Sequence, residues 1–471
     1  MAIPGLLKRI FAGKVTSPLP DPGLYHYQKN DGNSRIRIHL RINPDRSGIL
    51  VVNANRIFHL NSSATLMCYL TLEGNSSEKA IEILADWYSM DKVTVEKDYK
   101  EIASQIQVLT SPLSHCPICE LELEPILPFR SVPLAPYRMD LAITYRCNNQ
   151  CAHCYNARPR DFQELSTEKW KSIIQKLWDI GIPHLVFTGG EPTLRNDLPE
   201  LIEFAEKTGM ITGLNTNGMR LANPDYLKQL VDAGLDHVQI TLESHIEFIH
   251  DEMVAHRGAW RLTVEGIRNA LKSSLYVMTN TTLLQQNSPF ILDTIQFLHE
   301  LGVPTIGMNA LIYSGHGKSA RTGLPESRLP ELLEHVNQAI QQTGQKLIWY
   351  TPTHYCDFNP LEMGLGIKGC TAALYAMAIE PNGDVIPCQS YYSPLGNLLS
   401  QSWESIWNHP LAVSIRNRQI ISEECKQCQI LDVCGGGCPL ARGLDPSFKP
   451  SPILDEITRI SCSERTSYEL S

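Results

Sequence analysis

The stretch Asp140-Leu-Ala-Ile-Thr-Tyr-Arg-Cys-Asn-Asn-Gln-Cys-Ala-His-Cys-Tyr155 joins a strand-like apolar run to three closely spaced cysteines. Cys147, Cys151 and Cys154 follow the run in one short loop. Three thiolates in one loop can ligate three irons of a cubane cluster and leave the fourth iron without a protein ligand. Because an open iron can bind a small molecule and pass an electron into it, the stretch predicts a catalytic iron-sulfur cluster.

Two plainer interpretations of the cysteine triplet fit less well. A structural zinc site requires paired Cys-x2-Cys knuckles that supply four ligands. Disulfides belong to oxidising compartments, whereas the sequence opens Met-Ala-Ile-Pro-Gly-Leu without a signal peptide and has no uncharged stretch of membrane-spanning length. The 14 cysteines therefore indicate metal binding in a reducing cytoplasm.

Length and composition indicate a soluble globular protein of two or three domains. The chain has 471 residues, of which 43% are hydrophobic and 19% charged. A net charge of −9 argues against a general nucleic-acid binder. The cysteines are uneven: Cys68, Cys116 and Cys119 lie early, the triplet is central, and eight fall between Cys356 and Cys462. This distribution implies three regions.

Residues 133–318 alternate strand-like runs with segments of helical periodicity, which is typical of repeated βα units on a parallel sheet. Strands are expected at 139–145, 184–188, 211–215, 237–242, 277–282 and 304–311. Helices are expected at 166–180, 197–208, 224–233, 259–273 and 287–300, the first between Ser166 as N-cap and Gly181 as stop. The prediction is an α/β partial (βα)6 barrel whose chemistry lies at the carboxyl ends of the strands.

The run Thr188-Gly-Gly-Glu-Pro192 follows the second expected strand, and its glycines let the backbone approach a ligand closely. Combined with the Cys-x3-Cys-x2-Cys triplet, it resembles the radical S-adenosylmethionine (SAM) enzymes. The resemblance implies a [4Fe-4S] cluster on Cys147, Cys151 and Cys154 whose open iron chelates SAM. It also implies that reductive cleavage of SAM releases a 5′-deoxyadenosyl radical that abstracts a substrate hydrogen.

In that family the strand ends contact the rest of SAM. The residues that match here are Tyr155, Gly189, Gly190, Glu191, Asn217, Thr241, Glu243 and Leu311. Asn217 lies within Asn215-Thr-Asn-Gly218, which taken alone is equally an ordinary turn that ends a strand. Leu311 would form a wall beside the adenine.

Residues 350–465 carry cysteines whose gaps, with Glu380-Pro-Asn-Gly-Asp-Val-Ile-Pro-Cys388, resemble the SPASM extension of radical SAM proteins. The resemblance implies two auxiliary iron-sulfur clusters. One would take Cys370, Cys388 and Cys438, and the other Cys425, Cys428, Cys434 and Cys462. Seven cysteines leave one iron without a thiolate, which Cys356 could supply unless it is a small buried hydrophobe. A four-thiolate zinc knuckle at 425–438 is the rival.

Residues 30–110 begin with the alternating run Ser34–Ile42, which predicts a half-buried strand with arginines and a histidine on its outer face. Runs at 48–52 and 56–60 complete a three-stranded sheet, and helices are expected at 63–72, 77–88 and 96–109, the last opened by Asp98-Tyr99. This winged-helix-like α+β pattern resembles PqqD-like domains, which bind the leader of a precursor peptide beside the third strand. A plain packing domain is the alternative, and the roles of Cys116 and Cys119 stay open.

Together the three resemblances cover nearly the whole chain and imply a maturase of ribosomally made peptides. It would capture a leader, take electrons from a flavodoxin- or ferredoxin-type reductant, and form a thioether or carbon-carbon crosslink in the core peptide. No residue stands out as a general base. Alternatives are a radical SAM/SPASM enzyme that matures a folded protein or a small cofactor such as haem, and an iron-sulfur electron-transfer or scaffold protein.

Overall fold

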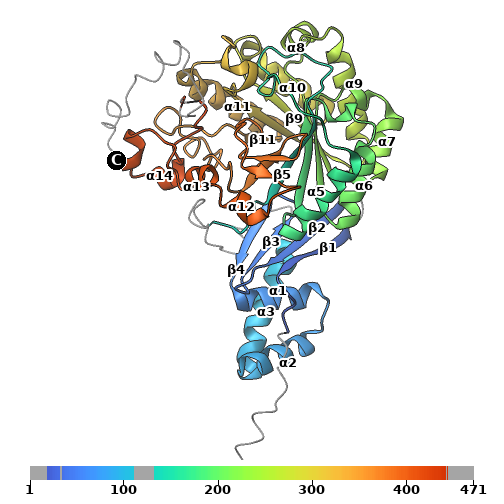
Figure 1. The fold of residues 1–471 in the computed structure, drawn as a ribbon, viewed down its shortest axis with the longest axis vertical. Helices are drawn as coiled ribbons and strands as arrows, with labels where there is room; N and C mark the ends of the chain where they lie inside the picture. Colours follow the sequence, from blue (N-terminus) through green and yellow to red (C-terminus); the bar gives the residue numbers. More distant parts are fainter. Residues whose placement is uncertain (1–17, 32–33, 111–131, 442, 444–471) are drawn as a thin grey trace, which may run out of the picture. The chain divides into compact units, whose positions relative to one another are not determined.

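The computed structural model describes residues 18–31, 34–110, 132–441 and 443, and the chain divides into two compact units, Met1–Pro125 and Ile126–Ser471 (Figure 1). Cys116, Cys119 and Cys462 lie outside the described residues. Among the helices that the structure describes, none is long and apolar enough to span a bilayer.

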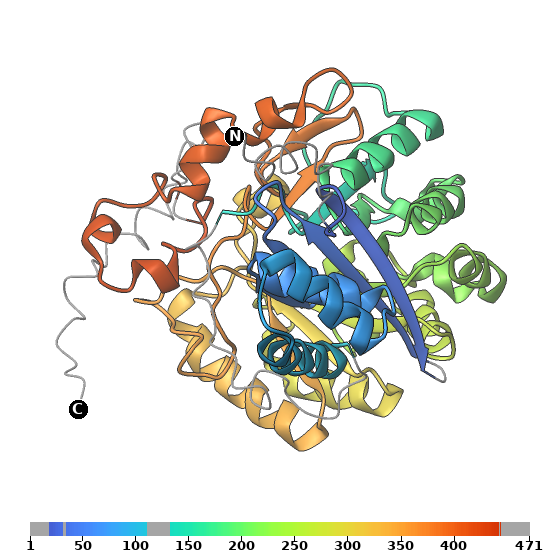
Figure 2. The same cartoon turned by 90° about the horizontal axis from the view of Figure 1, so that it is seen from below.

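The N-terminal unit is an antiparallel sheet of four strands in the order β1-β2-β3-β4, followed by three helices. The strands are β1 (Gly23–Asp31), β2 (Ser34–Ile42), β3 (Gly48–Val52) and β4 (Arg56–Leu60), and the helices are α1 (Ser62–Leu72), α2 (Ser77–Tyr88) and α3 (Lys92–Leu109). Figure 2 shows the helices over one face of the sheet. The core between them includes Ile38, Leu40 and Leu50 from strands and Leu66 and Leu84 from helices.

Three details of this unit correct the sequence-based expectations. Strand β1 was missed because its run Gly-Leu-Tyr-His-Tyr-Gln-Lys-Asn-Asp lacks a clear apolar alternation and is held by pairing with β2. Strand β2 is not half-exposed: Arg37, His39 and Arg41 are as buried as the isoleucines of its other face, and the ring of His26 on β1 stacks on that of His39. Helix α3 begins after Asp91, whose side chain caps it, and not at Asp98.

The C-terminal unit is built on a ten-stranded sheet in the order β11-β10-β9-β8-β7-β6-β5-β12-β13-β14. Neighbours from β11 to β12 are parallel, and β13 and β14 are antiparallel. The strands are β5 (Arg138–Thr144), β6 (His184–Gly189), β7 (Ile211–Thr216), β8 (His237–Thr241), β9 (Tyr276–Thr282), β10 (Thr305–Asn309), β11 (Lys346–Trp349), β12 (Ala376–Ile379), β13 (Asp384–Ile386) and β14 (Gly396–Asn397). The six strands expected from the sequence are confirmed as β5 to β10.

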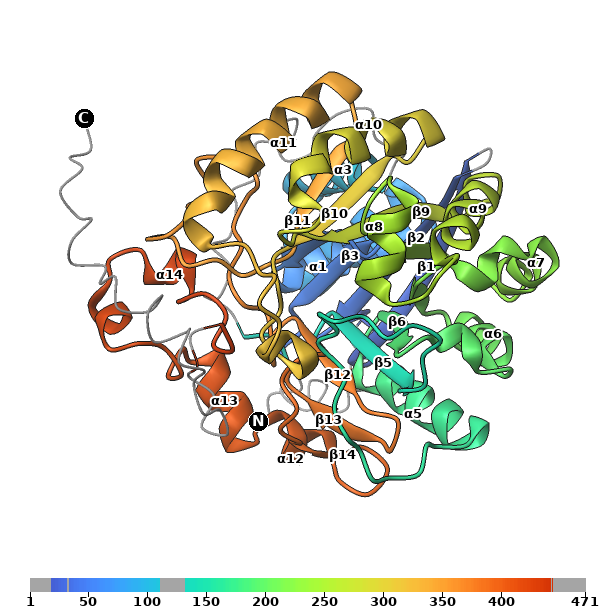
Figure 3. The same cartoon turned by 90° about the horizontal axis from the view of Figure 1, so that it is seen from above.

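Helices surround the outside of the curved sheet (Figure 3). They are α5 (Thr167–Ile180), α6 (Leu198–Thr208), α7 (Pro224–Asp232), α8 (Glu247–Val254), α9 (Ala259–Leu271), α10 (Ile291–Leu301) and α11 (Leu329–Thr343). Short 3-10 turns at Pro192–Leu194, Met219–Ala222, Ser288–Phe290, Gly315–Lys318 and Glu326–Arg328 connect them to the strands. Helix α5 lies between Ser166 and Gly181 as predicted, and Gly181 has a left-handed backbone with φ 94°.

The two faces of the sheet differ in chemistry. Leu141 and Ile143 of β5 and Phe187 of β6 belong to the large apolar core shared with the outer helices. Because side chains alternate along a strand, the residues between them, such as Asp140 and Thr188, face the other side of the sheet. That inner face is polar along most of the strands, so the barrel interior suits a polar ligand better than a packed apolar core would.

The segment after β10 extends the sheet further than the sequence predicted. Strand β11 adds a parallel strand at one edge, and the cysteine-rich region contributes β12 beside β5 at the other. The remaining helices are α12 (Trp403–Trp407), α13 (Pro410–Arg416), a 3-10 turn at Glu424–Gln427 and α14 (Leu431–Cys434). The barrel is therefore not limited to residues 133–318, and the cysteine-rich region is part of the same sheet.

Candidate functional site

The cysteine triplet lies in the loop that leaves the carboxyl end of β5. Within this loop the amide of Cys154 donates to the carbonyl of Cys151 at 3.2 Å, and the amide of Asn149 donates to the sulfur of Cys147 at 3.4 Å. Cys147 is exposed, whereas Cys151 and Cys154 are partly buried. Burial raises the pKa of the Cys151 thiol well above its ordinary value, and the neighbouring sulfurs of Cys154 and Cys147 add to the rise. The three sulfurs thus lie close enough to affect each other's pKa, and a cationic group bound among them would stabilise their thiolate forms.

Two glycines at the end of β6 allow this loop to pack directly on the strand. Gly189 has φ 136°, and a Cβ atom there would lie 2.0 Å from the backbone oxygen of Thr144. A Cβ on Gly190 would lie 2.3 Å from the backbone oxygen of Arg146. Only glycine fits such close approaches. The double glycine therefore fixes the distance between the β6 end and the cysteine loop, in addition to any contact it makes with a ligand.

Glu191 is 1% exposed, and its carboxylate is held by protein donors. Its Oε1 accepts from the Thr193 amide at 3.1 Å, the Thr193 hydroxyl at 2.6 Å and the Thr216 hydroxyl at 2.7 Å, and its Oε2 accepts from the Asn217 amide at 2.8 Å. Burial raises the pKa of Glu191, and these hydrogen bonds oppose the rise. Glu191 thus ties the end of β6 to the end of β7.

Asn217 continues this connection to the cysteine loop. Its side-chain amide donates to Asn148 Oδ1 at 2.7 Å, and its Oδ1 accepts from the Met219 amide at 3.1 Å. Asn148 lies between Cys147 and Cys151 in the loop. Asn217 is therefore bonded to the triplet loop, and its predicted contact with SAM stays a prediction.

Glu243 follows β8 and is also 1% exposed. Its Oε2 accepts from the Thr282 amide at 2.9 Å, and its Oε1 lies 3.1 Å from Nε2 of His153 in the cysteine loop. Thr241, the last residue of β8, pairs with Asn280 of β9 on the same inner face. These contacts bring the ends of β8 and β9 to the loop that carries the triplet.

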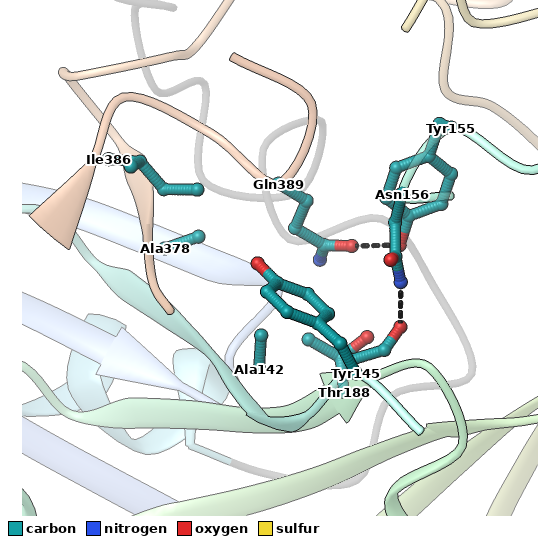
Figure 4. Close-up of a pocket in the computed structure, with 9 residues that line it drawn as sticks. Ala142, Tyr145, Tyr155, Asn156, Thr188, Ala378, Ile386 and Gln389 are labelled. Carbon is teal, nitrogen blue, oxygen red and sulfur yellow. Dashed lines mark hydrogen bonds between the residues drawn. The ribbon is translucent and has the colours of Figure 1, made fainter. Parts of the chain in front are cut away.

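Tyr155 lines a small pocket between the ends of β5, β6, β12 and β13 (Figure 4). Its hydroxyl donates to Gln389 Oε1 at 2.7 Å, and Gln389 donates in turn to Asp140 at 2.6 Å. Asn156, beside Tyr155 in Figure 4, donates to the Gly189 carbonyl. Because Gln389 directly follows Cys388, this chain of bonds connects the triplet loop to the cysteine-rich region.

Leu311 lies beyond the end of β10 and is 4% exposed. It packs with Met253 and Leu284, with Tyr313 at the edge of the cluster. A few residues later, the amide of His316 donates to the Cys154 carbonyl at 2.9 Å. Leu311 is thus an apolar wall at the same end of the barrel as the triplet.

The later cysteines form two groups. Burial raises the pKa of Cys388 to about 12, and the nearby thiols of Cys370 and Cys438 contribute. In the other group, burial raises the pKa of Cys434, with a further contribution from Cys428.

Cys425 belongs with this second group. Its sulfur lies 2.9 Å from Nε2 of His354, and the amide of Tyr355 donates to the Cys434 sulfur at 3.4 Å. Cys356, partly buried, follows this segment.

In the part of the chain that the structure describes, no group of three His, Cys, Asp or Glu side chains is placed to hold a single metal ion. Cysteine thiolates are the usual ligands of iron-sulfur clusters. The donor set, thiolates on short loops at a polar sheet edge, therefore fits iron-sulfur clusters.

Comparisons with known proteins agree with this chemistry. Residues 141–298 match the radical SAM superfamily model, and residues 370–429 match the SPASM model, an iron-sulfur cluster-binding domain. Residues 141–298 therefore form the radical SAM core of an enzyme, and residues 370–429 form a SPASM domain. The cofactors of the chain are a [4Fe-4S] cluster and SAM, with auxiliary iron-sulfur clusters in the SPASM domain.

Particular relatives span most of the chain. The PqqA peptide cyclase of Bradyrhizobium diazoefficiens is 29% identical over 347 residues, 68% of this chain and 88% of that protein. The Fe-coproporphyrin III synthase of Methanosarcina barkeri is 29% identical over 324 residues, 62% of this chain and 81% of that protein. Streptococcus suis SuiB bound to S-adenosylmethionine has the same fold, with a TM-score of 0.68 at 18% identity over 88% of this chain and 98% of SuiB.

Several side chains at this site were not singled out from the sequence. They are Asn148 and His153 within the triplet loop, Asp140 on β5, and Gln389 after Cys388. His153 and Gln389 directly precede or follow a cysteine, which was the available signal. Asp140 and Gln389 lie 249 positions apart in the sequence, so their contact depends on the pairing of β5 with β12.

Proposed function

We propose that this chain modifies a ribosomally synthesised precursor peptide and forms a crosslink or a related change in it. The observation that carries the proposal is the contact between the triplet loop and the SPASM region. Strand β12 pairs with β5, and the Tyr155 hydroxyl donates to Gln389, which follows Cys388. Two comparisons support a peptide substrate: the relatives named PqqA peptide cyclase, and SuiB, which is described bound to its precursor peptide SuiA.

The ligands of the clusters are assigned by the same proposal. Cys147, Cys151 and Cys154 hold the SAM-binding cluster, and the two later groups hold the auxiliary clusters, with Cys462 and Cys356 as further ligands. When bound, the first cluster and SAM supply a 5′-deoxyadenosyl radical that removes hydrogen from an unactivated carbon. The residues around them orient SAM: Gly189 and Gly190 keep the backbone close, and Glu191 and Asn217 hold the loop.

The N-terminal unit, residues 30–110 in the sequence-based division, is proposed to capture the leader of the peptide. Strand β4 is an edge strand that pairs only with β3 among the strands described, and its Ile57 is 36% exposed. An exposed edge can accept a peptide as an additional strand. Capture raises the effective concentration of the attached core peptide. We expect the protein to act in the cytoplasm with a flavodoxin- or ferredoxin-type reductant.

Co-expression with a candidate precursor peptide, chosen from any short open reading frame found beside the gene, tests the proposal. Mass spectrometry should show loss of two hydrogen atoms for each crosslink, and the Cys151→Ala variant should return unmodified peptide while still binding the leader. A peptide that stays unmodified by an enzyme that cleaves SAM would contradict the proposal.

A second candidate is modification of a small cofactor, because the Fe-coproporphyrin III synthase relative is as similar as the peptide cyclases. The two are separated by offering the reconstituted enzyme an iron coproporphyrin. Conversion of the porphyrin without change in any peptide would favour the second function.

A further inference from the structure

A pair of arginines, one with a buried side chain and one partly exposed, lies beside the triplet loop and shares a single carboxylate. Arg158 and Arg160 both follow Tyr155 in the chain. Nη2 of Arg158 lies 2.9 Å from Oε1 of Glu380, and Nε of Arg160 lies 3.6 Å from the same oxygen. Glu380 directly follows β12, so the pair sits at the carboxyl edge of the sheet, where the triplet loop begins.

The pair is enclosed by aromatic side chains. The guanidinium of Arg160 lies 3.3 Å from the ring centroid of Tyr145, and that of Arg158 lies 3.9 Å from the ring centroid of Tyr392. The Tyr392 hydroxyl donates to the carbonyl of Tyr155 at 3.3 Å. One side chain therefore separates the arginine pair from the residue that follows Cys154.

Some of the N–H donors of the two arginines have no hydrogen-bond acceptor among the described residues. The Arg160 side chain is 9% exposed, yet its Nη2 has no hydrogen-bond acceptor among the described residues, and the same holds for Nε of Arg158. Nη1 of Arg160 is used by the carbonyl of Asn156 at 2.6 Å. A buried guanidinium donor without an acceptor is costly. Two cations against one carboxylate also leave an excess positive charge, to which the 34% exposed Arg158 side chain gives access.

We propose that Arg158 and Arg160 form a binding site for a carboxylate of the substrate, an acidic side chain or a terminal carboxylate of the peptide. The planar guanidinium group binds carboxylates through paired hydrogen bonds. A carboxylate held there would supply the missing acceptor to Nη2 of Arg160 and balance the charge. The inference rests on the proposed function, since it names the substrate group that would lie next to the radical. A carboxylate is also present in SAM, and the test separates the two sources.

The test uses the anaerobically reconstituted full-length enzyme with two small probes, N-acetyl-L-glutamate α-methylamide and its neutral counterpart N-acetyl-L-glutamine α-methylamide. Calorimetric titration at millimolar probe should detect the acid and not the amide. In Arg160→Gln the affinity for the acid should fall at least about tenfold, as expected for loss of a charged hydrogen bond. Arg160→Lys should lie between them. The matched control Arg268→Gln, on the outer face of α9 with a 49% exposed side chain, should bind like the wild type.

The affinity for SAM is measured on the same samples, with iron content as a check that the clusters are intact. Unchanged SAM affinity together with loss of acid binding supports the inference. If Arg160→Gln loses SAM affinity and retains the acid probe, the arginines serve the carboxylate of SAM and the inference is overturned. Equal binding of acid and amide also overturns it. If Arg160→Gln loses iron, Arg158→Gln replaces it in the same titrations.

The inference and the proposed function fail separately. If the enzyme modifies a peptide but binds acid and amide probes equally, the proposed function stands and the carboxylate site is ruled out. If the enzyme selects the acid probe but modifies no peptide, the carboxylate site stands and the peptide substrate is ruled out.

Discussion

Replacement of Glu191 tests whether its carboxylate stabilises the fold between the ends of β6 and β7 or contacts SAM directly. Its carboxylate accepts four hydrogen bonds, two of them from the backbone amides of Thr193 and Asn217. In Glu191→Gln the amide group must face at least one of these donors, which costs about 1–3 kcal/mol for one unsatisfied buried group. In Glu191→Ala both backbone amides lose their acceptor, which doubles the cost to roughly 2–6 kcal/mol.

Urea unfolding of the anaerobic protein, followed by tryptophan fluorescence, measures these losses, and equilibrium dialysis measures SAM binding. Since Asn217 also holds Asn148 in the triplet loop, each kcal/mol lost there should raise the dissociation constant for SAM about fivefold. Glu200→Gln, with a 52% exposed side chain on α6, is the matched control and should change stability by less than about 0.5 kcal/mol. If Glu191→Gln keeps the wild-type free energy of unfolding but loses SAM binding, the stabilising role of its hydrogen bonds is refuted, and Glu191 is a direct ligand of SAM.

Three further outcomes are expected. Gly189→Ala should abolish soluble, cluster-loaded protein, because its Cβ would lie 2.0 Å from a backbone oxygen; Gly302→Ala, also at positive φ but with open space around it, should cost only about 1 kcal/mol by thermal unfolding. Burial lowers the pKa of His237 to about 4, so the unfolded chain binds a proton that the folded chain does not. Stability should therefore fall by about 1.4 kcal/mol per pH unit between the ordinary histidine pKa of about 6.5 and the folded-state pKa of about 4, and His237→Gln should flatten that slope. His354→Leu removes the side-chain nitrogen at the Cys425 sulfur, so redox titration by electron paramagnetic resonance should show one auxiliary cluster with a more negative midpoint potential; an unchanged potential would show that this contact does not tune the cluster.

The local parts of the fold were predictable because they depend on short-range patterns. Strands β5 to β10 and the helices α5, α6, α7, α9 and α10 follow from alternating apolar runs and from stops such as Gly181, whereas the short helix α8 was not predicted. Strand β1 and strand β11 are held by pairing with neighbours rather than by their own sequence, and both were missed. The placement of β12 beside β5 joins residues more than 200 positions apart, which no local pattern encodes.

In the site, too, local motifs could be predicted from the sequence, whereas contacts between distant segments could not. The sequence located the triplet, the glycines and the two buried glutamates, but not what the glutamates contact. The Glu191 carboxylate accepts from backbone and hydroxyl donors, and the predicted contact of Glu191 with SAM stays a prediction. Arg158 and Arg160 gave no signal, because a single arginine in a loop is usually solvated. Their burial depends on Glu380, which only the folded sheet brings next to them.

The central claim is that the triplet loop initiates radical chemistry on SAM. The most direct measurement is the yield of 5′-deoxyadenosine from the reconstituted enzyme with dithionite and SAM under strict anoxia. The wild type and Cys68→Ala, which changes a buried cysteine of the N-terminal unit, should both produce it, and Cys151→Ala should not. No product from a wild-type enzyme whose triplet cluster is intact, or retained product from Cys151→Ala, would contradict the claim.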